Sequence, residues 1–168
     1  MKLPFGDSYV VDTNVLITLM AHHPQDKPAY QAIWDEIESL IKQKNIFSAM
    51  EVYKEIIKYS GRSDQLKKWA ISHKKRFFIS PDEETCQLAR DIVKKFPDLV
   101  DKKKLQTGEP EADPFLIALA QSEGATIITQ EKKDIPNRIP MVALRYSVKS
   151  IDLYEFFERR KLKFVKEQ

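Results

Sequence analysis

The chain has 168 residues, of which 42% are hydrophobic and 32% charged, and its net charge at pH 7 is +3. These values argue against a disordered chain, and no apolar run approaches the roughly 20 residues of a membrane span. We therefore expect a single compact domain over residues 1–168, located in the cytoplasm because the start of the chain lacks a signal-peptide pattern, and without a disulfide because Cys86 is the only cysteine.

The first half of the chain alternates short apolar segments with longer helical patterns. In chain order, the expected elements are a strand at 8–11, a short helix at 15–20, a helix at 28–42, a strand at 45–48, and helices at 51–61 and 63–73. Asn14 is the expected N-cap of the first helix, because its side chain can accept a hydrogen bond from the backbone two or three residues on. Pro28 suits a first helical turn, and Gly61 suits a helix end.

The second half continues this alternation. The expected elements are a strand at 76–79, a helix from 80–82 to 96, an irregular charged loop at 98–112, a helix at 112–123, strands at 125–128 and 139–142, and a helix at 150–159. The strands are short and continuously apolar, as is typical of strands covered on both faces. This order predicts an α/β fold with a mostly parallel sheet, and in such sheets ligands bind beyond the carboxyl ends of the strands.

Several acids fall at those strand ends or on the helices that follow. They are Asp12, Glu51, Glu55, Asp113 and Glu131. Each has an ordinary alternative role, such as a helix cap or a charge near a helix N-terminus. If they converge, their mutual repulsion calls for a cation, and carboxylate oxygens are the ligands that Mg²⁺ and Mn²⁺ prefer. The chemistry expected of such a site is metal-assisted hydrolysis.

Four segments give the chain a family resemblance: YVVDTNVLI (9–17), EVYKEI (51–56), EADPFLIALA (111–120) and TIITQEKKD (126–134). Together they resemble the PIN-domain nucleases, and specifically the PIN-like family DUF4411, which is related to the VapC-type toxins. The resemblance implies a three-layer α/β/α fold around a central, mostly parallel sheet of four to five strands. It also implies a Mg²⁺- or Mn²⁺-dependent endoribonuclease, the toxin of a toxin–antitoxin pair, with RNA as substrate, a cognate antitoxin as partner and a homodimeric assembly.

The resemblance also implies roles for individual residues. The residues matched to the metal-binding and catalytic acids are Asp12, Glu55, Asp113 and Glu131. Asn14 and Thr129 match polar positions that orient Asp12 by hydrogen bonds. The middle acid is ambiguous between Glu55 and Glu51, and Asp134 is an alternative to Glu131, which stands where the family usually has aspartate.

Other interpretations remain open on the sequence alone. The glutamate at 131 motivates a non-catalytic RNA- or protein-binding module on a degenerate PIN fold. A phosphatase with Asp12 as nucleophile is a third alternative, although such enzymes commonly need an acid where this chain has Asn14. Trp69, Phe77 and Phe78 lie among lysines and could stack on single-stranded RNA, but core packing is the commoner role of such residues.

Overall fold

The computed structural model describes residues 7–58, 64–109 and 111–163. The strands are β1 (Tyr9–Val11), β2 (Ile46–Ala49), β3 (Phe78–Ile79), β4 (Thr126–Ile128) and β5 (Ser150–Ile151). The helices are α1 (Thr13–His22), α2 (Gln31–Lys42), α3 (Met50–Lys58), α4 (Asp64–Phe77), α5 (Glu83–Lys95), α6 (Lys102–Thr107), α7 (Asp113–Glu123), α8 (Ile139–Leu144) and α9 (Leu153–Arg159). Short 3₁₀ turns occur at Pro28–Tyr30 and Pro97–Leu99. Among these helices, none is long and apolar enough to cross a membrane.

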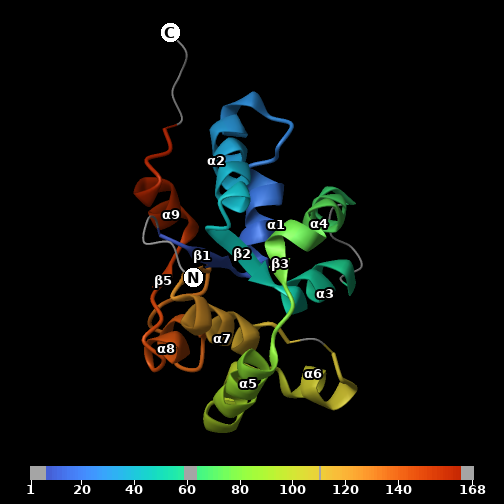
Figure 1. The fold of residues 1–168 in the computed structure, drawn as a ribbon, viewed down its shortest axis with the longest axis vertical. Coiled ribbons are helices and arrows are strands. Elements are labelled where there is room, and N and C mark those ends of the chain that lie inside the picture. Colours follow the sequence, from blue (N-terminus) through green and yellow to red (C-terminus); the bar gives the residue numbers. More distant parts are fainter. Residues whose placement is uncertain (1–6, 59–63, 110, 164–168) are drawn as a thin grey trace.

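The five strands form one sheet in the order β3-β2-β1-β4-β5, and each neighbouring pair is parallel. Helices α2, α4 and α9 lie on one side of this sheet, and α5, α7 and α8 lie on the other (Figure 1). The three-layer α/β/α architecture predicted from the sequence is therefore confirmed. Strand β1 is central, and Val11 pairs with Ile128 of β4, so the residues that follow these two strands emerge side by side.

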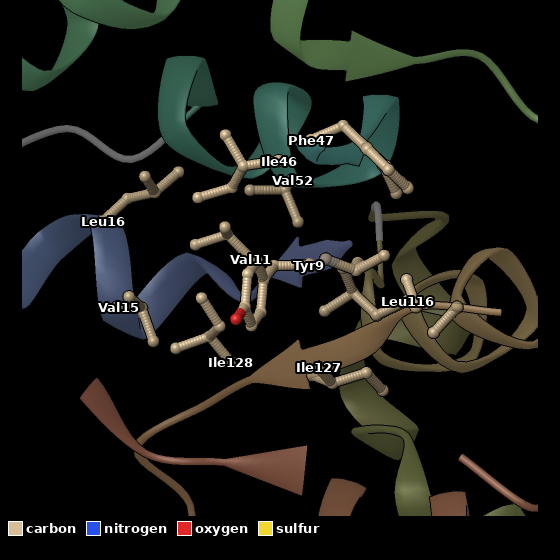
Figure 2. Packing of buried hydrophobic residues seen from close by; sticks show 14 of the residues in the cluster. Tyr9, Val11, Val15, Leu16, Ile46, Phe47, Val52, Leu116, Ile127 and Ile128 are labelled. Carbon is tan, nitrogen blue, oxygen red and sulfur yellow. The ribbon is translucent and has the colours of Figure 1, made fainter. Parts of the chain in front are cut away.

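The core fills the space on both sides of β1 and explains why the strands are apolar throughout. All residues of β1 and β2 are buried. Val15 and Leu16 of α1 pack near Ile128 and Val11, and Leu116 of α7 lies near Ile127 (Figure 2). Burial of both faces, rather than alternation of apolar and polar residues, is what the sequence pattern of these strands reflects.

Helix α7 brings its first residue to the carboxyl end of the sheet. It packs against β1, β2 and β4, and five of its consecutive residues from Leu116 to Ala120 are buried. Pro114 lies in its first turn, where a missing N–H costs nothing, and Gly124 ends it with φ 59°, a left-handed conformation that glycine adopts freely. Asp113 therefore begins a helix that is anchored in the core from Pro114 to Ala120.

The expectation of a strand at 139–142 is wrong. This segment forms the helix α8, with Pro140 in its first turn and with Ile139, Val142 and Ala143 buried. The fifth strand is instead Ser150–Ile151, where the sequence predicted the start of the last helix. That helix, α9, begins at Leu153 after Asp152, whose side chain accepts from the Glu155 N–H in a capping box.

Other boundaries also differ from expectation. The segment predicted as an irregular loop contains α6, which Asp101 caps at its start and Gly108 ends. The N-cap of α1 is Asp12 rather than Asn14. The strand expected at 76–79 is confined to Phe78–Ile79 because α4 continues to Phe77, and Gly61 lies outside the described residues.

The aromatic residues considered for RNA stacking belong to the core. Trp69, Phe77 and Phe78 are all buried, and their rings meet edge to face. They are therefore not available to stack on a nucleic acid.

Candidate metal centre

A pocket of about 550 Å³ lies at the carboxyl end of the sheet. Among the described residues, seven acidic and four basic side chains line it. The acids nearest the strand ends and the start of α7 are Asp12, Glu55, Glu111, Asp113 and Glu131. The structure thus gathers the four acids matched by resemblance in one hollow, together with Glu111, which the sequence reasoning did not single out.

Asp12 lies directly after β1, and both of its carboxylate oxygens are held by the protein. Its Oδ1 accepts from the Thr13 N–H at 2.6 Å, and its Oδ2 accepts from the Thr129 hydroxyl at 2.7 Å. The side chain is only 5% exposed. Burial raises the pKa of Asp12 from its usual 3.8 to about 7; the Thr129 hydrogen bond opposes this rise, and the negative charge of Glu131 adds to it.

Asp113, the first residue of α7, faces the same pocket. Burial raises the pKa of Asp113 well above its usual range, and the charges of Asp12 and Glu131 raise it further. A bound cation would stabilise the charged forms of two neighbouring acids whose ionisation is disfavoured. The raised pKa values of Asp12 and Asp113 are therefore the main physical sign of a functional site in the described structure.

Glu55 joins three elements around the pocket. Its Oε2 accepts from the Thr13 hydroxyl at 2.6 Å, and its Oε1 accepts from the Ala112 N–H at 3.1 Å. Glu51 lies elsewhere: it is buried at the start of α3, within 3.6 Å of the Lys54 ammonium, and is not among the residues that line the pocket. Of the two candidates for the middle acid, Glu55 is the one that faces Asp12.

Glu131 lines the pocket but is turned toward protein donors. Its Oε2 accepts from the Ile139 N–H at the start of α8 at 2.8 Å, and its Oε1 lies 3.6 Å from the Arg138 guanidinium. The alternative acid Asp134 is exposed and is not among the lining residues. Glu131 therefore links the pocket to α8, a contact that the shorter side chain of aspartate would not reach so readily.

The two polar residues matched to orienting positions make different contacts. Thr129 holds Asp12 directly and also accepts from the Glu131 N–H at 3.2 Å. Asn14 does not bond to Asp12 among the contacts described; its Oδ1 accepts from the Gln130 N–H at 3.2 Å. Thr129 thus orients the carboxylate, whereas Asn14 fastens the segment after β4 to α1.

Lys104 and Glu111 are two charged pocket residues that the sequence reasoning did not assign to the site. The Lys104 ammonium lies 3.6 Å from Glu111 Oε2 and 4.0 Å from Glu55 Oε1. Asp101 and Gly108, which bound α6, were the only sequence signals for this part of the pocket, because α6 has no apolar stripe. A charged segment expected to be a loop therefore supplies a cation to the site.

The pocket acids are chemically suited to bind a hard divalent cation, but their side chains do not converge on one point. In the part of the chain that the structure describes, no three His, Cys, Asp or Glu side chains are placed so as to hold a metal ion. Asp12 and Asp113 offer oxygens of the kind that Mg²⁺ and Mn²⁺ prefer, and the charge of Asp12 disfavours ionisation of Asp113. Recruitment of Glu55 or Glu131 as a third ligand requires that its carboxylate turn away from the protein donors it now contacts.

The fold of this chain is similar to that of chains in solved VapBC structures. A chain in the structure of VapBC-1 from nontypeable Haemophilus influenzae matches with 20% identity and a TM-score of 0.54, over 86% of this chain and 96% of that one. A chain in the structure of DNA-bound VapBC from Salmonella typhimurium matches with 15% identity and a TM-score of 0.53, over 88% and 98%. At such identities the likeness concerns the fold, which is PIN-like.

No curated protein matches the chain. The model of a protein family described as a domain of unknown function, DUF4411, matches residues 9–164, which is nearly the whole chain. The chain therefore belongs to the DUF4411 family.

Proposed function

We propose that this protein is a Mg²⁺- or Mn²⁺-dependent endoribonuclease that hydrolyses phosphodiester bonds in RNA. The observation that carries the proposal is the pair Asp12 and Asp113 at the carboxyl end of a parallel sheet. Asp12 is buried, Asp113 is half-buried, both line one pocket, and the pKa values of both are raised. A pair of this kind gains from binding a divalent cation, and phosphodiester hydrolysis is a reaction for which such a cation is suited.

The residues of the pocket have separate tasks in this proposal. Asp12 and Asp113 would hold the cation, and Glu55 or Glu131 would complete its ligands. When bound, the cation supplies an acidified water and balances the charge that develops on the phosphate oxygens. Thr129 and the Thr13 N–H fix the Asp12 carboxylate in one orientation, which lowers the cost of organising the site when the cation arrives.

The basic residues at the rim support a polyanionic substrate. Lys58, Lys67 and Arg138 line the pocket, and the side chains of Lys58 and Arg138 are more than half exposed. Ammonium and guanidinium groups around an acidic centre bind phosphates by charge without reading sequence. An RNA strand could then be held on both sides of the bond that is cut.

We extend the proposal to a partner. Both structures compared above are of VapBC, and the fold likeness supports a role as the toxin of a toxin–antitoxin pair, with a cognate antitoxin protein as partner. The homodimeric assembly that the family resemblance implies is part of the same proposal.

A second candidate function rests on Glu131. Its carboxylate is engaged by Ile139 N–H and by Arg138, and no set of three convergent ligands exists among the described side chains. This arrangement favours a non-catalytic RNA- or protein-binding module that keeps the PIN-like fold.

Cleavage of a mixed pool of single-stranded RNA in the presence of Mg²⁺ or Mn²⁺ separates the two candidates. The nuclease proposal predicts cleavage by the natural chain and its loss in Asp12→Asn and in Asp113→Asn. Cleavage that survives both substitutions would show that the wrong residues have been assigned. RNA retention without cleavage, unchanged by Mn²⁺, would favour the binding module.

A further inference from the structure

We propose that the pocket takes one divalent cation, between Asp12 and Asp113, because the Lys104 ammonium occupies the position beside Glu55 and Glu111 where a second cation would be held. This inference rests on the metal site of the proposed function. It gives a role in the site to a lysine that the family resemblance did not match to it, and it fixes the number of ions.

The position of Lys104 is set by the fold. Helix α6 begins after Asp101, whose side chain accepts from the Lys103 N–H at 2.8 Å, and it ends at Gly108, which has φ 67°. These caps hold a six-residue helix at the pocket wall and direct Lys104 inward, so that its side chain is 34% exposed. The neighbouring Lys102, on the same helix, is 78% exposed and faces Asp98 instead.

The two acids beside Lys104 depend on it for compensation. The Glu111 side chain is 12% exposed, and its Oε2 is buried without a hydrogen-bond partner in the described structure, apart from the ammonium 3.6 Å away. Glu55 shares its Oε1 between the Ala112 N–H and the same ammonium.

Lys104 also stays charged in this setting. Its ammonium lies 3.6 Å from Glu111 Oε2 and 4.0 Å from Glu55 Oε1, and neighbouring carboxylates favour the charged form of an amine. A charged amine beside two acids of the pocket is an internal cation. It would repel a second divalent ion placed among the same carboxylates.

The charge of the pocket agrees with a single ion. Among the residues that the structure describes, seven acidic and four basic side chains line it, which gives a net charge of −3 if all are ionised. One divalent cation leaves −1, whereas two would leave +1 before any substrate binds. The ammonium is further suited to donate a hydrogen bond to a phosphate oxygen, the task that a second metal ion performs in two-metal sites.

The test is the stoichiometry of Mn²⁺ binding, measured by calorimetric titration of the full chain and by electron paramagnetic resonance of the bound ion. The natural chain is expected to bind one ion, with the spectrum of an isolated Mn²⁺. Lys104→Met keeps the length of the side chain and removes its charge, and it is expected to bind two ions with a spin-coupled spectrum. Lys104→Arg and the same-helix control Lys102→Met should each bind one.

Two results would overturn the inference: two ions in the natural chain, or a single ion in a folded Lys104→Met variant. If Lys104→Met does not fold, Lys104→Gln removes the same charge and is expected to bind two ions, and a single ion in that variant would equally overturn the inference. The absence of any bound Mn²⁺ in the natural chain would be a different failure, because it would remove the metal site on which the proposed function rests.

Discussion

The hydroxyl of Thr129 donates to Oδ2 of Asp12 at 2.7 Å, and both residues directly follow neighbouring parallel strands. The register that pairs Val11 with Ile128 brings these side chains together across 117 positions of sequence. Because both residues are buried, this hydrogen bond fixes the orientation of a carboxylate whose ionisation burial opposes.

The first prediction concerns this hydrogen bond. Thr129→Val keeps the shape of the side chain and removes the donor, so Asp12 loses the interaction that most favours its charged form. We expect the affinity for Mn²⁺ to fall by about 10- to 100-fold, as is usual when an orienting partner of a metal ligand is lost. Calorimetric titration measures the effect, with Thr126→Val, on the strand that Thr129 follows, as control. Equal affinity in the two variants would show that Thr129 does not orient a ligand.

The second prediction concerns pH and the metal-free protein. The pKa of Asp12 is about 7 in the folded state against 3.8 ordinarily, so between these values the folded protein retains a proton that the unfolded chain has released. The free energy of unfolding should therefore fall as pH rises from about 4 to about 7, by roughly 4 kcal/mol from this group. Asp113 shifts stability in the same direction.

Urea unfolding at several pH values, with a chelator present to remove metal ions, measures this pH dependence of the free energy of unfolding. Asp12→Asn is the reference, because it lacks the titrating group. The difference in free energy between the two proteins should increase with pH across this window, with the variant the more stable at pH 7. A difference that does not depend on pH would mean that Asp12 titrates normally.

The third prediction concerns the glutamate at the end of β4. Glu131→Asp shortens the side chain, so its carboxylate should release the Ile139 N–H and turn to the pocket. We expect tighter Mn²⁺ binding and a loss of about 1 kcal/mol of stability from the start of α8. Arg138→Gln, which leaves the bond to Ile139 intact, should change Mn²⁺ affinity less. Weaker binding in Glu131→Asp would show that the glutamate already reaches the metal.

The fourth prediction concerns the helix that carries Asp113. Leu116 of α7 is fully buried against the sheet, so Leu116→Ala should lower the free energy of unfolding by about 2–5 kcal/mol through lost burial and a cavity. Leu144→Ala, at a side chain that is 60% exposed, should change it by less than about 0.5 kcal/mol. Urea unfolding compares the two. Similar small effects would mean that α7 is not anchored as the structure implies.

Much of the fold could be predicted because its helices and strands have strong local signals. The α2 region shows apolar residues at helical spacing, and α7 combines Pro114 near its start with Gly124 at its end. A strand was predicted at 139–142 because isoleucine, methionine and valine also suit a strand. In the structure this segment is helical and packs against β5 and α7, and no local pattern indicates that packing. The two-residue strand Ser150–Ile151 is too short to show any pattern.

The candidate site could be predicted where acids follow strands or open helices. Asp12 and Asp113 were found by that rule, because parallel strands end at one edge of the sheet. Glu111 and Lys104 were not assigned to the site because they lie in a charged segment without periodicity, and their proximity depends on the short helix α6. The turn of Glu131 toward α8 is a tertiary contact that no local pattern encodes.

The most direct test of the metal centre is the anomalous diffraction of a crystal soaked in Mn²⁺. We predict one anomalous peak between the carboxylates of Asp12 and Asp113, with the Lys104 ammonium still beside Glu55 and Glu111. A peak elsewhere, or none at a Mn²⁺ concentration that occupies ordinary carboxylate sites, would contradict the assignment of these two acids as metal ligands.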